Sequence, residues 1–219
     1  MKAIAPGKLI LCGEHAVVYG RPAIAMAIDR CAQTVISPTD GATAEVHFEL
    51  PDVQTHESFT LRALRDFRER VQRNYEDFIQ GRLQVRDIIR KPVDLFQYAF
   101  ITILDGLHLH LTRGLRIQMH STIPIGCGMG SSAATILSVL RAVGHYFRVE
   151  FRPDWYYRYS LEVERLQHGF PSGVDSYISL HGGCALFRAG QAQRIPLCLL
   201  YTSDAADDLL CVDLGGRRI

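Results

Sequence analysis

Two kinds of hydrophobic pattern divide the chain, namely short apolar runs in its first third and helical periodicity after residue 60. The runs lie at residues 2–5, 9–12, 23–28, 31–37 and 44–50. Turn residues at Pro6-Gly7 and at Asp40-Gly41 separate some of them, and short apolar runs bounded by turn signals are typical of strands. The first third is therefore predicted to be rich in β-structure.

From residue 61 onward, apolar side chains recur every three or four positions. Leu61, Leu64, Phe67 and Val71 begin a series among charged residues that predicts an amphipathic helix over 61–79. Further helices are predicted at 93–111, at 131–147, at 153–168 and from Val174, with strands at 115–119 and 184–187. The order of strands, helices, strand, loop and helices predicts an α+β fold.

The composition limits the kinds of molecule that the chain is expected to bind. The chain has 219 residues, 47% of them hydrophobic and 21% charged, with a formal net charge of +1. A balanced charge favours neither nucleic acid nor an anionic membrane as a partner. The chain also lacks a run of about 18 apolar residues, the length that a membrane-spanning helix needs. Pro6, Gly7 and Lys8 break the first apolar run, which excludes a signal peptide.

The cysteines indicate a reducing compartment. The six are Cys12, Cys31, Cys127, Cys184, Cys198 and Cys211, and no two form a C-x-x-C pair. Scattered cysteines of this kind are interpreted as small buried hydrophobic residues of a cytoplasmic protein, rather than as disulfides or a zinc site.

The strongest chemical signal is the segment PIGCGMGSSAA at residues 124–134. Gly126, Gly128 and Gly130 alternate between a predicted strand and a predicted helix, where glycine lets the backbone approach an anion closely. Backbone N–H groups and the dipole at a helix N-terminus hold phosphate. Ser131 and Ser132 are expected to cap the helix, and a hydroxyl there also suits Mg²⁺. The alternative is a flexible loop with an ordinary helix cap, but the combination favours phosphate.

Two further segments place charge near predicted strand or helix ends. In PGKLILCGEHAVVYG (6–20), Lys8, Glu14 and His15 flank an apolar strand, although a solvated lysine and a surface turn remain the plain alternative. In EVERLQHGFPSGVD (162–175), Glu164 lies late in a helix, where the dipole disfavours a carboxylate, so a cation partner is predicted. Asp175 follows a Pro-Ser-Gly loop, where its simpler role is that of a helix N-terminal charge.

Together the three segments resemble the GHMP small-molecule kinases, and among these most of all the mevalonate kinases. The resemblance covers about residues 2–196. Met129 stands where leucine is usual in the family, and Phe170 where asparagine is common. Three ordered motifs at suitable separations are more specific than any one alone.

The resemblance implies a role for each motif residue. Asp175 is implied as the catalytic base that takes the proton from the substrate hydroxyl, with Lys8 beside it to stabilise the transferred phosphoryl group. Ser132 and Glu164 are implied as Mg²⁺ ligands, and Glu14 and His15 as neighbours of the acceptor. The implied ATP contacts are Lys8, Ser121, Gly126, Cys127, Gly128, Met129, Gly130, Ser131 and Ser132.

The family also implies an architecture and a reaction. Residues 1–197 are expected to form its N-terminal α+β domain, of the type found in ribosomal protein S5 domain 2, without the C-terminal α+β domain. Residues 198–219 resemble nothing in the family and are interpreted as a sequencing artefact, with a divergent natural terminus as the alternative. The fragment itself is expected to be inactive.

The implied reaction of the full-length protein, expected as a homodimer, is ATP- and Mg²⁺-dependent phosphorylation of mevalonate in isoprenoid biosynthesis. Another small alcohol, such as a sugar or phosphomevalonate, is the nearer alternative. A non-catalytic nucleotide-binding relative is the more distant one.

Overall fold

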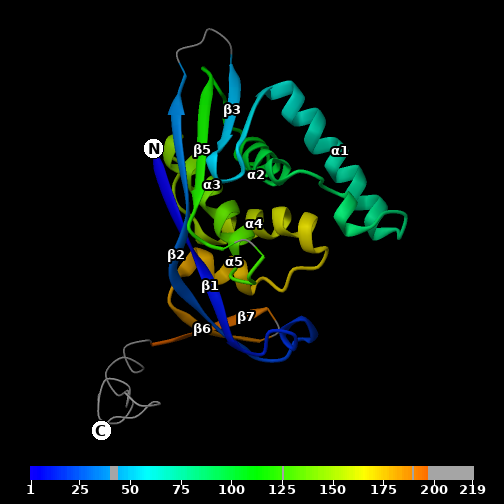
Figure 1. Ribbon diagram of the computed structural model, residues 1–219, viewed down its shortest axis with the longest axis vertical. Coiled ribbons are helices and arrows are strands. Elements are labelled where there is room, and N and C mark those ends of the chain that lie inside the picture. The colour runs from blue at the N-terminus through cyan, green and yellow to red at the C-terminus, as the bar shows by residue number, and fades with distance from the viewer. Residues whose placement is uncertain (40–43, 125, 189, 197–219) are drawn as a thin grey trace.

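The chain folds into a seven-stranded sheet with helices packed against it (Figure 1). The computed structural model describes residues 1–39, 44–124, 126–188 and 190–196. The strands are β1 (Lys2–Cys12), β2 (Ala23–Pro38), β3 (Glu45–Leu50), β4 (Thr55–Thr60), β5 (Leu115–Ser121), β6 (Cys184–Arg188) and β7 (Gln191–Ile195). The helices are α1 (Leu61–Ile79), α2 (Pro92–Gly106), α3 (Ser131–Tyr146), α4 (Pro153–His168) and α5 (Val174–His181), with 3₁₀ turns η1 (Val17–Tyr19), η2 (Pro51–Val53) and η3 (Val85–Asp87). The predicted α+β class is confirmed.

Strand β2 organises the sheet, whose order is β4-β3-β5-β2-β6-β7, with β1 paired to β2. The first residues of β2 pair with β6 and its last residues with β5, while β1 runs antiparallel along it. Strands β3 and β5 are parallel neighbours, and the remaining pairs are antiparallel. One long strand thus joins the two ends of the sheet.

The predicted division of β1 and of β2 into two strands each is wrong. Pro6-Gly7 lies inside β1, where the pairing register with β2 shifts between Pro6 and Lys8. A Cβ on Gly7 would lie 2.8 Å from the carbonyl oxygen of Met129, so this glycine permits a close approach rather than a turn. The turn predicted at Asp40-Gly41 lies outside the described residues.

Two edge strands were not predicted from the sequence. In β4 (THESFT) half-buried and exposed positions alternate, in β7 (QAQRI) most positions are exposed, and few side chains in either strand are strongly apolar. An edge strand that buries one face needs little hydrophobic sequence, because its partner supplies the hydrogen bonds. Their pairing with β3 and β6 therefore depends on contacts that no local pattern records.

The helices match their predicted ranges, except that α2 ends at Gly106 rather than near residue 111. The backbone leaves the helix at Leu107, and His108 adopts a positive φ of 51°. A Cβ on Gly106 would lie 2.4 Å from the hydroxyl oxygen of Tyr159 on α4, so the end of α2 packs closely on α4. Tertiary packing here overrides the continuing hydrophobic pattern.

The main hydrophobic core lies between the sheet and the helices, which Figure 1 shows to one side of it. Within the described ranges, no helix is both long and apolar enough to cross a bilayer. The prediction that the cysteines are buried is confirmed for Cys184 but wrong for Cys12 and Cys127, which are exposed. Cys198 and Cys211 lie outside the described residues.

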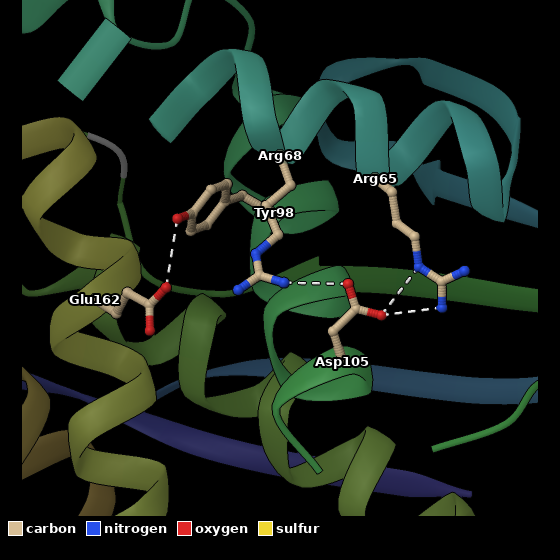
Figure 2. A network of polar contacts seen from close by, with 5 residues as sticks. All are labelled: Arg65, Arg68, Tyr98, Asp105 and Glu162. Atoms are coloured by element: carbon tan, nitrogen blue, oxygen red, sulfur yellow. Dashed lines mark hydrogen bonds and ion pairs between the residues drawn. The ribbon is translucent and has the colours of Figure 1, made fainter. Parts of the chain in front are cut away.

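A polar network joins three helices on the outer side of this core (Figure 2). Asp105 of α2 accepts hydrogen bonds from Arg65 and Arg68 of α1, each at 3.1 Å. Tyr98 of α2 donates its hydroxyl to Glu162 of α4 at 3.4 Å, and burial raises the pKa of this tyrosine. These contacts fix α4, which also carries Glu164.

Candidate active site

The glycine-rich loop leads directly into the N-terminus of α3. Gly126, Gly128 and Gly130 all have positive φ, at 77°, 68° and 67°. Gly130 itself occupies the cap position of α3, and no side chain caps the helix, so the predicted serine cap is wrong. The backbone N–H groups of the first helical turn lack side-chain acceptors there and suit an anion.

The loop is fixed to β1 at Lys8. The backbone N–H of Lys8 donates to the carbonyl of Met129 at 2.9 Å. A Cβ on Gly130 would lie 2.7 Å from Cγ of Lys8, so the lysine side chain passes directly against this glycine. The glycine-rich segment at 124–134 and the segment at 6–20 therefore form one structural unit, although more than a hundred residues separate Lys8 from Met129 in the sequence.

The side chain of Lys8 also contacts the segment at 162–175, where its Nζ lies 3.2 Å from Oδ1 of Asp175. Lys8 is only 4% exposed, and buried ammonium groups require a paired charge. Asp175 lies in the first turn of α5 and is partly accessible. The two residues that the sequence suggested for proton transfer and charge stabilisation are thus in contact.

Glu164 lies buried behind this pair, at 2% exposure. Its Oε2 accepts a hydrogen bond of 2.8 Å from the hydroxyl of Ser176. Burial and the nearby charge of Asp175 raise the pKa of Glu164 to about 7, although Ser176 and Lys8 act against that rise. Among the described residues the direct partner of Glu164 is therefore a hydroxyl, and the cation Lys8 acts on it from further away.

A cleft of about 760 Å³ opens in front of these groups, within the usual size range of ligand pockets. Of the predicted site residues, it is lined by Lys8, Glu14, Ser121, Gly126, Gly128, Met129, Gly130, Ser131, Ser132 and Asp175. His15, Cys127 and Glu164 are absent from the described lining. The lining also has an apolar part, which includes Leu50, Val53, Val85, Ile89, Leu95, Phe96 and Met119, and the cations Arg86, Arg90 and Lys91 line the same cleft. The cleft thus combines a phosphate-type loop with an apolar surface.

Sequence reasoning missed Asp52 and His120, which also line the cleft. Asp52 follows β3, and its carboxylate contacts Nδ1 of His120 and the backbone N–H of Ser121, both at 2.7 Å. The contact fastens η2 to the end of β5 across 68 residues of sequence. No local motif marks such a pair.

Phe170, where the chain departs from the family pattern, lies away from the cleft. It is 74% exposed, with its ring centroid 5.8 Å from that of Phe78. It lines a separate cavity of about 810 Å³ beside Trp155 and Tyr159. Phe170 is therefore absent from the described lining of the cleft.

The donor set around Asp175 fits a magnesium ion that arrives with a nucleotide. No cluster of three or more His, Cys, Asp or Glu side chains suited to a metal occurs among the described residues. Mg²⁺ bound through phosphates needs only one or two protein carboxylates. Glu164 and Asp175 are close enough for the charge of one to raise the pKa of the other, and Ser132 offers a hydroxyl at the cleft. Such a pair of carboxylates favours a cation.

Comparison with known proteins indicates a class. Residues 94–183 match the family model of the GHMP kinases N terminal domain. The match runs from within α2 to just past the end of α5, and the α+β fold agrees with such a domain.

Over most of its length the chain is also similar to mevalonate kinases. It is 30% identical to that of Thermococcus sibiricus, over 89% of this chain and 54% of the relative. It is also 30% identical to that of Pyrococcus abyssi, over 99% of this chain and 61% of the relative. The crystal structure of Methanococcus jannaschii mevalonate kinase superposes with a TM-score of 0.74 at 28% identity, over 90% of this chain and 56% of that one. The chain thus spans little more than half the length of these relatives.

Proposed function

We propose that the whole protein to which this chain belongs transfers the γ-phosphoryl group of ATP to the hydroxyl of mevalonate. The observation that carries the proposal is the contact between Lys8 and Asp175, at 3.2 Å, beside the uncapped N-terminus of α3. Phosphoryl transfer depends on positioning and charge stabilisation, which this arrangement supplies. Similarity to mevalonate kinases supports the choice of acceptor.

The nucleotide is proposed to bind in the cleft. Backbone groups from Gly126 to Ser132, together with Cys127 and Met129 of the same loop, hold the triphosphate, and Ser121 is a weaker contact. The apolar part of the lining, which includes Leu95 and Phe96, suits the flat face of a base. Positive φ at the glycines lets their N–H groups turn toward phosphate oxygens.

Asp175 is proposed as the general base that accepts the proton of the acceptor hydroxyl. Lys8 holds the Asp175 carboxylate in place through their ion pair and, from the same position, stabilises the negative charge of the transferred group. Glu14, which lines the cleft, and His15 are proposed to orient the acceptor.

Ser132 and Glu164 are proposed to hold Mg²⁺. When bound, the ion neutralises phosphate charge and orients the phosphoryl group. Glu164 must be ionised to serve as a ligand, and a neighbouring cation favours that form.

A GHMP kinase for a different small alcohol, such as a sugar or phosphomevalonate, is the second candidate. A catalytically inactive nucleotide-binding relative is the third, but the contact between Lys8 and Asp175 argues against loss of the site. We further propose residues 1–197 as the ATP-binding domain and residues 198–219, outside the described part of the chain, as a non-family tail.

A coupled ADP-release assay of the full-length protein tests the proposal, with mevalonate, phosphomevalonate, galactose and homoserine as acceptors. Preference for mevalonate is expected. Turnover of another alcohol would reject the substrate and keep the kinase, whereas ATP binding without turnover of any acceptor would favour the non-catalytic relative.

A further inference from the structure

Ser176 links two helices through a single buried hydrogen bond. Its hydroxyl on α5 donates to Oε2 of Glu164 on α4 at 2.8 Å. Ser176 is fully buried and Glu164 is 2% exposed, so water does not compete for the bond. A hydrogen bond to a buried carboxylate is among the stronger kinds in proteins.

The neighbouring residue on α5 makes the other essential contact. Asp175 pairs with Lys8 of β1, while Ser176 bonds to Glu164 of α4. Successive side chains of a helix point about 100° apart, so the first turn of α5 holds β1 with one residue and α4 with the next. The positions of Asp175 and Glu164 relative to each other therefore depend on this turn.

A hydroxyl is suited to this task because it orients a carboxylate without neutralising it. A lysine or arginine in the same place would supply the positive charge itself and compete with a metal ion. Ser176 satisfies one carboxylate oxygen and leaves the net charge of Glu164 available.

We propose that Ser176 is a positioning residue that holds the Glu164 carboxylate for the metal ion accompanying the nucleotide. The inference rests on the proposed function. It adds Ser176, a residue to which none of the three segments at 6–20, 124–134 and 162–175 assigns a role. Ser176 touches neither nucleotide nor acceptor in this scheme and acts through Glu164 alone.

The chain offers a matched control in Ser179, one turn further along α5. Ser179 is also fully buried, and its hydroxyl has no hydrogen-bond partner among the described residues. Ser179→Ala therefore removes the same group from the same helix without touching Glu164. Ser176→Thr keeps the hydroxyl and should restore what Ser176→Ala loses.

The test is Mn²⁺ binding to the 219-residue chain in the presence of a non-hydrolysable ATP analogue, followed by electron paramagnetic resonance. Ser176→Ala is expected to weaken Mn²⁺ binding about 10–100-fold, the usual effect of removing a residue that orients a metal ligand. Ser176→Thr and Ser179→Ala should stay within about twofold of the unmodified chain. Affinity for the analogue in EDTA should be the same in all four proteins, which shows that the fold is intact.

Three results are informative. If Ser176→Ala matches Ser179→Ala, the positioning role is rejected and the proposed function stands. If Ser176→Ala lowers metal-free nucleotide affinity equally, its role is structural and the inference is again rejected. If the unmodified chain binds neither the analogue nor Mn²⁺, the assignment of the nucleotide and metal to this cleft is rejected, and the role of Ser176 is rejected with it.

Discussion

Asp175 illustrates how a residue with a plain structural explanation acquires a chemical one. An acidic side chain in the first turn of a helix is favoured by the helix dipole without any function. The contact with buried Lys8 exceeds that need, since a lone dipole interaction does not require a lysine to leave water. The sequence suggested each residue separately, whereas their contact depends on the tertiary fold.

Asp175→Asn is expected to lower kcat of the full-length protein about 10²–10⁴-fold, the range for loss of a general base. ATP affinity should change little, because asparagine keeps the shape. Steady-state kinetics with mevalonate measure both.

Asp154→Asn provides the control, because Asp154 lies in the first turn of α4, as Asp175 does in α5, and is exposed. Equal effects of the two substitutions would mean that Asp175 is only a helix-terminal charge.

Because Glu164 has a raised pKa, we expect the free energy of unfolding to depend on pH. Its pKa rises from an ordinary 4.5 to about 7 in the folded chain, so between these values the folded state keeps a proton that the unfolded state releases. The contribution of Glu164 to the free energy of unfolding is therefore fully present below about pH 4.5 and is lost as the pH rises toward 7. The difference of about 2.5 pKa units corresponds to about 3 kcal/mol.

Glu164→Gln should flatten this part of the pH profile in EDTA, as measured by urea unfolding between pH 4.5 and 8. Glu162→Gln, two residues earlier on the same helix, is the comparison. A slope in Glu164→Gln as steep as in the unmodified chain would show that another group causes it.

At the scale of elements, we expect alanine substitutions at different glycines of the glycine-rich loop to lower the free energy of unfolding by different amounts. Gly130→Ala combines the cost of a positive φ with a contact of 2.7 Å to Cγ of Lys8, whereas nothing lies within 4 Å of a Cβ on Gly126. We expect Gly126→Ala to cost roughly 1–2 kcal/mol from the backbone alone. Gly130→Ala should cost about 1–3 kcal/mol more.

Urea unfolding of the two variants measures the difference. Equal losses would mean that Lys8 does not pack on Gly130 as described. A larger loss for Gly126→Ala would point to a different loop conformation.

The sequence predicted the elements whose signals are local and missed those that depend on partners. Helix α1 was predicted with the bounds that the structure has, because its apolar stripe lies within one segment. Strands β4 and β7 were missed because edge strands bury only one face. Pro6-Gly7 was misread as a turn, since close approach to Met129 leaves no trace in neighbouring residues.

The same division holds for the candidate site, where residues with local signals were predicted and residues that depend on distant partners were missed. The motifs supplied Lys8, the glycine loop and Asp175 because each has a recognisable local context. Ser176 and Asp52 were not found, because each acts through hydrogen bonds to residues that lie far away in the sequence or on another element.

At the scale of the whole molecule, the chain contains the cleft that we propose as the nucleotide site, while it spans little more than half the length of its relatives. We expect the 219-residue chain to bind ATP and to show little turnover of mevalonate. The groups assigned to ATP lie in this part, whereas in-line positioning of an acceptor needs an enclosed site.

Calorimetric titration with ATP and a coupled turnover assay on the same preparation check this expectation. A monodisperse preparation with turnover near about 10 s⁻¹, typical of an enzyme, would contradict it. Absence of nucleotide binding would contradict the assignment of the cleft.

The burial of Lys8 makes this protein suitable for chemical footprinting. The sequence contains three lysines, Lys2, Lys8 and Lys91, and of these only Lys8 is buried. An amine-reactive reagent should therefore acetylate Lys2 and Lys91 quickly and Lys8 slowly, so that mass spectrometry of three peptides reads the state of the cleft. The two exposed lysines act as internal standards, and the acetylation rate at Lys8 reports how often its contact with Asp175 opens.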